Sequence, residues 1–366
     1  MDVTSVDDVL MCADPRQWRP GDSWLAGGTV IFSYGTDITR GAPTRLLDIT
    51  DSGWPPLTWH HPPSSRPHER TPEGPLTGTT REVEGVPALE IAATCRIAEL
   101  RALADEPSPG GVPRAALPGL DLIPPACDSF VASWKIWNVS TVGGNVATGL
   151  PAGPMISLLS GWGATALILC PDGSARRAPV AELIVGPART RLADGELIRS
   201  FLVPGHALAQ TPAFRRISLT ERGRSAALLI GRRTSASGLR LVVTASTFHP
   251  IVLDVTADPD PRNGTAGSGT AGSGTAGIAA RADDARGGTG IAVRADGAAW
   301  RDAIDAAVAR TRGWYDDIHG EPAWRRLMTH RLGEEILAEL LPESAIGVDD
   351  AIGRVTGDLR LERSTR

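Results

Sequence analysis

The sequence predicts an α+β protein, and three observations support this fold class. Residues 24–34 are typical of a strand, a glycine turn and a helix in that order. Residues 164–180 contain two β-like runs on either side of Pro-Asp-Gly, which indicates a hairpin. Residues 213–255 contain four further strand-like runs, and two helices with apolar stripes follow within residues 300–340. Strands in runs, with helices grouped after them, favour α+β over α/β.

The remaining elements are predicted from short apolar runs. Residues 60–80 are dense in proline and polar side chains, so we expect a surface excursion between strands there. The other expected elements are a helix at 6–11, strands at 46–49 and 88–94, a helix at 97–104, helical turns at 155–159 and 181–184, and a strand at 196–203.

A chain of 366 residues is long enough for more than one domain, and composition indicates the boundaries. Thr-Ala-Gly-Ser-Gly repeats within residues 257–290 are typical of a flexible, low-complexity insertion. The predicted organisation is a first domain at 1–205 with subdomains of about 1–55 and 56–205, a second domain at 211–342, and a loose tail at 343–366.

Overall charge and apolar content indicate an ordinary globular protein. The net charge is −5, and no block of lysine or arginine is present, so we expect no nucleic-acid or anionic-membrane partner. The longest apolar run, residues 155–170, is interrupted at 160–163 and is too short to span a bilayer. The acidic N-terminus lacks an apolar segment, so no signal peptide is expected.

The cysteines and histidines do not form a metal-ligand pattern. Four cysteines are scattered without Cys-x-x-Cys spacing, which argues against a zinc ribbon or an iron–sulfur cluster in this chain. His60, His61 and His68 have no carboxylate or cysteine framework beside them. We therefore predict reduced thiols, a cytoplasmic location and no metal site.

The main candidate site is the stretch from Ser140 to Thr148, in which a glycine doublet lies among small hydrogen-bonding side chains. With 41 glycines in 366 residues, about four or five doublets are expected by chance, and the chain has four. The flanking residues therefore carry the signal, and residues 24–29 repeat the same chemistry earlier in the chain. Glycine backbones leave N–H groups free to cradle a phosphate. We predict that the two loops close on one dinucleotide.

Several common nucleotide and hydrolase motifs are absent. No complete Gly-x-Gly-x-x-Gly follows a predicted strand, so a Rossmann site is not expected. The phosphate-binding P-loop, the His-Glu-x-x-His zinc motif and the Gly-x-Ser-x-Gly nucleophile motif are also missing.

Several stretches in order resemble one family, the flavoprotein subunits of molybdenum hydroxylases, which include the xanthine dehydrogenase FAD subunit and the carbon monoxide dehydrogenase medium subunit. Its two FAD-binding loops resemble Trp24-Leu25-Ala26-Gly27-Gly28-Thr29 and Ser140-Thr141-Val142-Gly143-Gly144-Asn145. Residues 46–49, 89–94, 171–173 and 187–203 resemble its later strands and hairpin. Residues 315–326 resemble its C-terminal signature, with Trp324 in place of the usual tyrosine.

The resemblance implies a two-subdomain FAD-binding domain of the vanillyl-alcohol-oxidase (PCMH) type, followed by a small α+β domain. It implies FAD as cofactor, a molybdopterin-binding large subunit and a 2Fe-2S small subunit as partners, and NAD⁺ or another acceptor for the electrons. No side chain is nominated as a catalytic acid or base. The implied cofactor-binding residues are Leu25, Ala26, Gly27, Gly28, Thr29, Thr141, Gly143, Gly144, Asn145, Thr148, Leu197, Ile198 and Arg215.

The chain departs from the family pattern at two places beside the loops. Val30 stands where relatives have an acidic or amide residue, and Pro154 stands where they have an aspartate. Side-chain support for the flavin is therefore reduced. Two alternatives to an electron-transfer subunit stay open: a stand-alone flavin oxidoreductase of the same fold, and a non-catalytic assembly subunit that has lost FAD.

Overall fold

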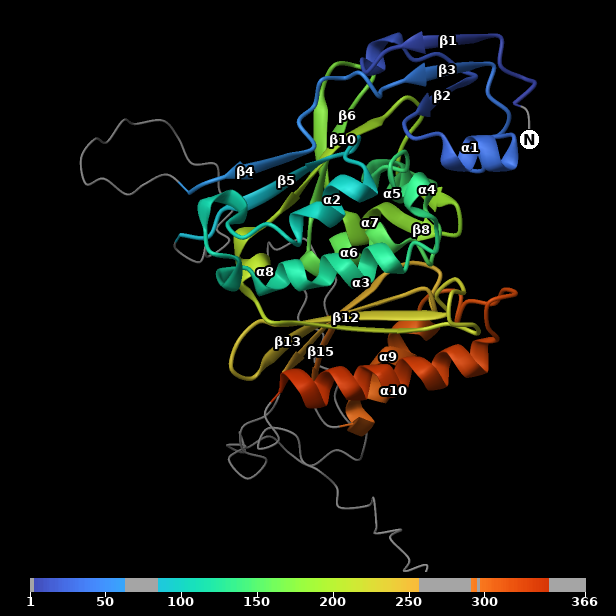
Figure 1. The fold of residues 1–366 in the computed structure, drawn as a ribbon. Helices are drawn as coiled ribbons and strands as arrows, with labels where there is room; N and C mark the ends of the chain where they lie inside the picture. Colours follow the sequence, from blue (N-terminus) through green and yellow to red (C-terminus); the bar gives the residue numbers. More distant parts are fainter. Residues whose placement is uncertain (1–2, 63–84, 257–290, 295–296, 342–366) are drawn as a thin grey trace, which may run out of the picture.

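The computed structural model describes residues 3–62, 85–256, 291–294 and 297–341. Three sheets follow one another from the N-terminus, with helices packed between the second and the third and beyond the third (Figure 1). The predicted insertion, the tail and nearly all of the predicted excursion at 60–80 lie outside the described residues. No helix in the described ranges is long and apolar enough to cross a membrane.

The first sheet, called here the N-terminal sheet, has three parallel strands in the order β1-β3-β2. The predicted strand, turn and helix at 24–34 are confirmed, but the predicted helix at 6–11 is wrong, because this segment contains a strand. Its backbone pairs with a strand much later in the chain, and a local pattern does not reveal such a partner. The elements are β1 (Asp8–Met11), a 3₁₀ turn (Pro15–Gln17), β2 (Asp22–Leu25), α1 (Thr29–Tyr34) and β3 (Arg45–Asp48).

The second sheet, the central sheet, is antiparallel in the order β4-β5-β10-β6-β7. It confirms the predicted hairpin at 164–180 and the strands at 88–94 and 196–203. Its strands are β4 (Leu57–His60), β5 (Ala88–Ala92), β6 (Thr165–Leu169), β7 (Ala175–Pro179) and β10 (Leu197–Val203).

Short helices connect the strands of the central sheet. Five of them are α2 (Ile97–Leu103), α3 (Ile123–Asp128), α4 (Trp134–Trp137), α5 (Val142–Thr148) and α6 (Pro154–Trp162). The others are α7 (Val180–Leu183), α8 (Gly205–Ala209) and the 3₁₀ turns Pro109–Gly111, Arg114–Ala116 and Pro118–Leu122, together with the small hairpin β8 (Ile184–Gly186) and β9 (Arg189–Thr190).

The third sheet, the C-terminal sheet, confirms the four predicted antiparallel strands and adds a fifth that is parallel to its neighbour. Two helices cover its far face, at the bottom of Figure 1. The elements are β11 (Pro212–Ile217), β12 (Ala227–Arg233), β13 (Gly238–Thr244), β14 (Ile251–Thr256), β15 (Ile291–Arg294), α9 (Gly297–Ala309) and α10 (Pro322–Leu340).

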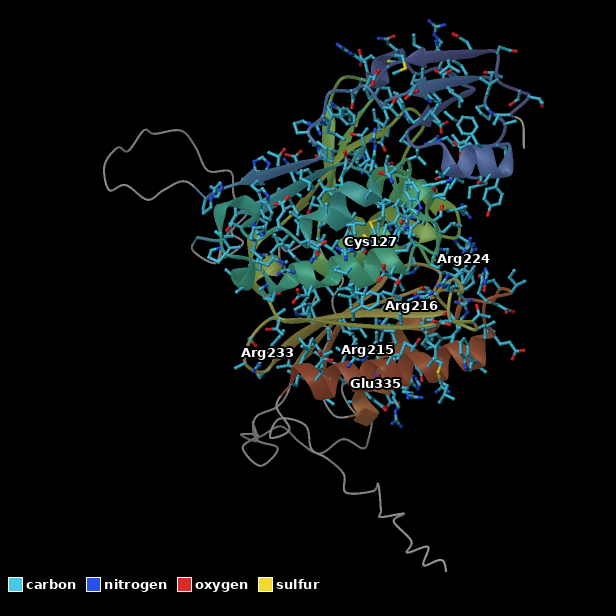
Figure 2. All side chains as sticks on the ribbon, in the orientation of Figure 1. Cys127, Arg215, Arg216, Arg224, Arg233 and Glu335 are labelled. Carbon is cyan, nitrogen blue, oxygen red and sulfur yellow. The ribbon has the colours of Figure 1, made fainter. Side chains whose placement is uncertain are left out.

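The two faces of the C-terminal sheet contact different helices, as strand alternation requires. On β11 the Arg215 side chain faces α10, where its Nε lies 3.1 Å from Glu335, and Figure 2 shows the two side by side. The neighbouring Phe214 packs against the core of the central part. The C-terminal sheet therefore lies between α6 on one face and α9 and α10 on the other.

The two C-terminal helices confirm most of the predicted apolar stripes. Trp300, Ile304 and Val308 of α9 are buried. In α10, however, Leu327 is 61% exposed. Arg325 and Thr329 occupy the buried face of that turn, so the apolar pattern identified the wrong side there.

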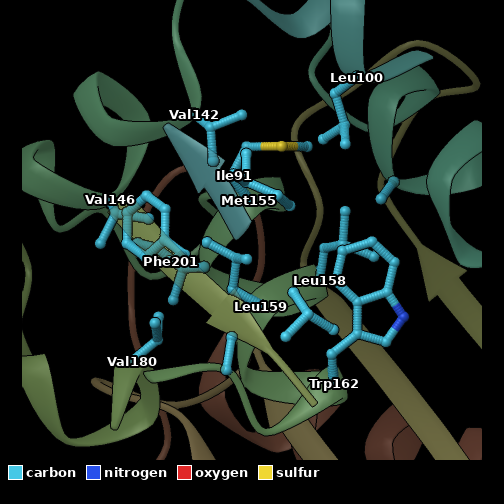
Figure 3. Close-up of a cluster of buried hydrophobic side chains, with 14 of the residues drawn as sticks. Ile91, Leu100, Val142, Val146, Met155, Leu158, Leu159, Trp162, Val180 and Phe201 are labelled. Carbon is cyan, nitrogen blue, oxygen red and sulfur yellow. The ribbon is translucent and has the colours of Figure 1, made fainter. Parts of the chain in front are cut away.

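The largest core lies around α6, in which every residue is buried (Figure 3). Met155 and Leu159 pack in the same cluster as Ile91 and Phe201 of the central sheet. Ile230 of β12 also belongs to this cluster. A helix that is apolar all round lies within a core, and α6 joins the central and C-terminal sheets through one continuous core.

Arg325 is a buried polar junction at the start of α10, with a side chain that is 1% exposed. Its Nη1 donates to the carbonyls of Ala226 and Ala245 at 2.7 and 2.6 Å, and its Nε donates to Gly320 at 2.8 Å. Its guanidinium also pairs with Asp317. Burial lowers the pKa of Arg325 from its ordinary value. The side chain thus ties α10 to the ends of two strands of the C-terminal sheet.

Replacing Arg325 with Met should lower the free energy of unfolding of the C-terminal part by about 3 kcal/mol, because three buried carbonyls lose their donor. Urea unfolding followed by tryptophan fluorescence measures this change. The matched control is Arg326→Met, because Arg326 is 54% exposed and makes only a surface pair with Asp305, for which we expect about 1 kcal/mol or less. Equal effects of the two substitutions would contradict the assignment of Arg325 as a junction.

Candidate functional site

A cavity of about 1100 Å³, including the space at its mouth, lies between the N-terminal sheet and the central part. Most of its lining comes from four segments, namely parts of 24–31, 37–40, 140–148 and 190–198, and Ile49, Ala93 and Phe130 complete it. The first two segments precede residues 60–80 in the sequence, and the last two follow them. The cavity therefore forms only when the N-terminal sheet packs against the central part.

The structure brings most of the predicted site residues to this cavity. Leu25 and Arg215 are the exceptions. The lining includes Ala26, Gly27, Gly28, Thr29, Thr141, Gly143, Gly144, Asn145, Thr148, Leu197 and Ile198.

The placement of Leu25 and Arg215 follows from strand geometry, in which successive side chains point to opposite faces. On β2, Trp24 lines the cavity and Leu25 packs against Ile31 and Leu46 in the small N-terminal core. Arg215 faces α10, where it also pairs with Glu339 at 2.5 Å. Arg215 was predicted as a cofactor-binding residue, and the structure corrects this placement, because its side chain lies on the far face of β11, away from the cavity lining.

The first glycine loop has the backbone groups expected of an anion cradle. Gly28 has a φ of 66°, a left-handed conformation that favours glycine. Among the described residues, the N–H groups of Ala26, Gly27 and Gly28 have no acceptor. The first N–H groups of α1 follow directly, and helix geometry leaves them unbonded within the helix. Residues 26–31, which all line the cavity, therefore offer a series of unbonded donors of the kind that an anion site needs.

The second glycine stretch is not the loop that we predicted. It is the first turn of α5, and its N–H groups are bonded within the protein. Val142 donates to the carbonyl of Cys95 and Gly143 to that of Ala93, both at 2.9 Å, and Gly144 donates to Thr141 Oγ1 at 3.0 Å. Neither glycine of the pair has a positive φ. This stretch attaches α5 to the end of β5 and gives the cavity a wall of small residues.

Gly143 is required for that attachment, because a Cβ there would overlap Ala93. Gly144 has only Thr141 Oγ1 near the position of a Cβ, at 3.0 Å. Asn145 connects the wall to the core, since its Oδ1 accepts from the Met155 N–H at 3.0 Å and so caps α6. The wall is thus held from behind by the largest core.

The two glycine stretches touch one another, which confirms their expected proximity. A Cβ on Gly27 would overlap the carbonyl oxygen of Val139, so only glycine fits this approach. Beside this contact, Ser140 Oγ donates to Thr29 Oγ1 at 3.2 Å. The floor of the cavity is therefore a direct backbone contact between the N-terminal sheet and the central part.

The opposite wall was missed from the sequence. Asp37 organises its first half, where one carboxylate oxygen accepts from the Thr39 N–H at 2.8 Å and the other accepts from Ser23 Oγ at 2.9 Å. An Asp-x-Thr pattern in a polar loop is a known turn signal, and it could have indicated this structure. The second half, from Thr190 to Glu196, has no comparable signal.

Glu196 fixes the second half of this wall and is 7% exposed. Its two carboxylate oxygens each accept a 2.6 Å hydrogen bond from Arg176, and one of them also accepts from the Ala193 N–H at 2.8 Å. The hydrogen bonds from Arg176 hold the pKa of Glu196 below its ordinary value. Glu196 is therefore a structural anion that shapes the loop beside the cavity.

Comparisons with known proteins bear directly on this cavity. Residues 81–206 match the family described as FAD binding domain in molybdopterin dehydrogenase. Residues 81–206 form a domain of this family. Its cofactor is FAD. A search of curated proteins by sequence gives no match.

Solved structures resemble nearly the whole chain. A reconstituted CO dehydrogenase from Oligotropha carboxidovorans has a TM-score of 0.61 at 17% identity, covering 92% of this chain and 97% of that chain. Quinoline 2-oxidoreductase from Pseudomonas putida 86 has a TM-score of 0.58 at 15% identity, covering 91% and 96%. At these identities the likeness shows the fold, which is the PCMH-type FAD fold with its C-terminal domain.

The residues present fit FAD in this FAD-binding domain. The free N–H groups of residues 26–28, which line the cavity, suit the pyrophosphate. Leu197 and Ile198 of β10 add apolar surface of the kind that a flavin ring contacts. When bound, FAD supplies the redox chemistry, and the protein binds and orients it.

Replacing Gly27 with Ala should weaken FAD binding at least tenfold, because the new methyl group forces apart the two stretches that form the cavity floor. Titration of the apoprotein with FAD, followed by quenching of flavin fluorescence, measures the dissociation constant. Gly186→Ala is the matched control, since a Cβ at Gly186 meets no atom within 4 Å. Unchanged affinity in the Gly27 variant would show that this contact does not shape the site.

Replacing Glu196 with Gln should lower the free energy of unfolding by about 2 kcal/mol at pH 7, which lies within the range for hydrogen bonds to charged groups. The folded-state pKa lies below the unfolded value of about 4.3, so this contribution is present above that pH. It is lost as the pH falls through the folded-state pKa. The difference between wild type and variant should therefore narrow below about pH 4 in urea titrations, and a difference independent of pH would contradict the assigned charge.

Proposed function

We propose that this chain is the FAD-carrying electron-transfer subunit of a heteromeric molybdenum hydroxylase. It receives electrons from 2Fe-2S clusters on a small partner subunit, and a molybdopterin-binding large subunit is their source. The acceptor is NAD⁺ or another oxidant. The observation that carries the proposal is the match of residues 81–206 to an FAD-binding domain that lines a cavity suited to FAD.

The extent of the fold likeness supports a subunit of this type. The likeness to single chains of CO dehydrogenase and quinoline 2-oxidoreductase structures covers 91–92% of this chain, so it extends well beyond residues 81–206. As part of the proposal, residues 1–205 are the FAD domain and residues 211–342 the C-terminal domain. The cytoplasmic location remains a sequence prediction.

The cavity supports cofactor binding more than direct catalysis by side chains. Its carboxylates, Asp37 and Glu196, both accept hydrogen bonds from neighbouring protein groups. Their arrangement stabilises the two halves of one wall. The protein therefore holds and orients FAD, and the redox chemistry belongs to the cofactor.

The purified chain, incubated with FAD and desalted, should retain flavin absorption in a one-to-one ratio. Coexpressed with a molybdopterin-binding and a 2Fe-2S subunit, it should co-purify with both, and its flavin should be reduced by the chemically reduced 2Fe-2S subunit much faster than by the reductant alone. The matched control is the same reaction without the 2Fe-2S subunit. A colourless chain would indicate an assembly subunit without FAD, and full activity as a monomer would indicate a stand-alone oxidoreductase.

A further inference from the structure

We propose that Arg40 and Asp194 form a latch that closes the FAD cavity and slows the release of FAD. The latch joins the loop after α1 to the loop between β9 and β10. With this latch, the N-terminal sheet covers the cavity and is attached to the central part on two sides of it. This inference rests on the proposed function only in that the cavity holds FAD, and it does not depend on the partner subunits or the electron acceptor.

The N-terminal sheet contacts the central part on two sides of the cavity. On the floor, Gly27 lies against Val139, as described above. On the opposite wall, the Arg40 guanidinium pairs with Asp194, and its Nη2 donates to the Ala193 carbonyl at 2.9 Å. Arg40 itself lines the cavity. Bound FAD would therefore lie between a close backbone contact and an ion pair, of which the ion pair is the easier to open.

The acceptor side of the latch is held rigidly. Glu196 accepts hydrogen bonds from the Ala193 N–H and from Arg176. Arg176 in turn donates to the Arg191 carbonyl at 3.0 Å. Gly195 has a φ of 76° and packs closely against Trp18 of the N-terminal part. The loop therefore fixes the Ala193 carbonyl and the backbone of Asp194, whose side chain is 79% exposed.

The donor side is equally restrained. Arg40 lies in a tight loop in which Asp37 and Gly41 form an isolated β-bridge, and the Gly41 N–H donates to the Asp37 carbonyl at 2.7 Å. Asp37 is fixed in turn by Ser23 at the start of β2. Two preorganised partners lose little conformational entropy when they pair, which favours the closed arrangement.

An exposed pair of this kind has a modest effect, so the expected change lies in the rate of FAD release. Arg40→Ala and Asp194→Ala should each speed release between about twofold and fivefold. The double variant should release FAD no faster than either single variant, because both remove the same interaction. Added salt should speed release from the wild type toward the rate of the variants and should affect the variants less.

The measurement is the recovery of flavin fluorescence after the holoprotein is diluted into a large volume of FAD-free buffer, in which rebinding of FAD is negligible. The charge-swapped variant, Arg40→Asp with Asp194→Arg, should release FAD more slowly than either Ala variant. Arg101→Ala is the matched control, because Arg101 and Asp105 form a similarly exposed pair, 32% and 74%, within α2. This control should leave the release rate unchanged.

Two results would overturn the latch while leaving FAD binding intact. Unchanged release in both Ala variants would show that the pair does not restrain the cover. A faster release for Arg40→Ala alone, with Asp194→Ala unchanged or slower, would show that Arg40 binds the cofactor directly. A wild-type chain that takes up no FAD would overturn the proposed function together with the latch.

Discussion

The burial of α6 is the constraint on which the rest of the structure depends. This nine-residue helix is buried along its whole length, and its side chains reach both the central sheet and β12. Its first turn is capped by Asn145, which lines the cavity, and near its last turn the Gly161 carbonyl accepts from the buried Arg232 of β12. Burial lowers the pKa of Arg232 to about 9. One packed helix therefore fixes the position of the cavity wall and of the C-terminal sheet together.

Glycines in the two motif stretches serve different physical purposes, although their sequences look alike. Gly27 and Gly143 permit close approach, to Val139 and Ala93 respectively, where any Cβ would overlap protein atoms. Gly28 instead supplies a left-handed turn that leaves neighbouring N–H groups free. A glycine doublet thus predicts a tight backbone, but it does not show whether that backbone faces a ligand or another strand. The structure assigns the free donors to the first stretch, whereas each stretch contains one glycine that permits close packing.

Local signals predicted the elements that depend on local interactions. The hairpin of β6 and β7 has a turn signal between its strands, and α9 has a stripe whose members are all buried. The strand β1 was not predicted because its partner β3 is distant in sequence. Arg215 was misplaced because a shift of one residue on a strand changes the face. The wall formed by residues 37–40 and 190–196 could not be predicted, since its two halves meet only through tertiary structure.

The arrangement of charges around the cavity favours the binding of a cofactor over acid–base chemistry by the side chains that line it. Glu196 is neutralised by Arg176, and Asp194 by Arg40, so these carboxylates stabilise the walls. Among the described residues that line the cavity, the backbone N–H groups of Ala26, Gly27 and Gly28 remain free, and they lie at the turn formed by Gly28. Backbone donors do not titrate, so the affinity for an anionic cofactor would stay constant over the pH range in which the walls stay ordered. In the proposed function, the protein supplies a preorganised cradle for FAD, and FAD supplies the redox chemistry.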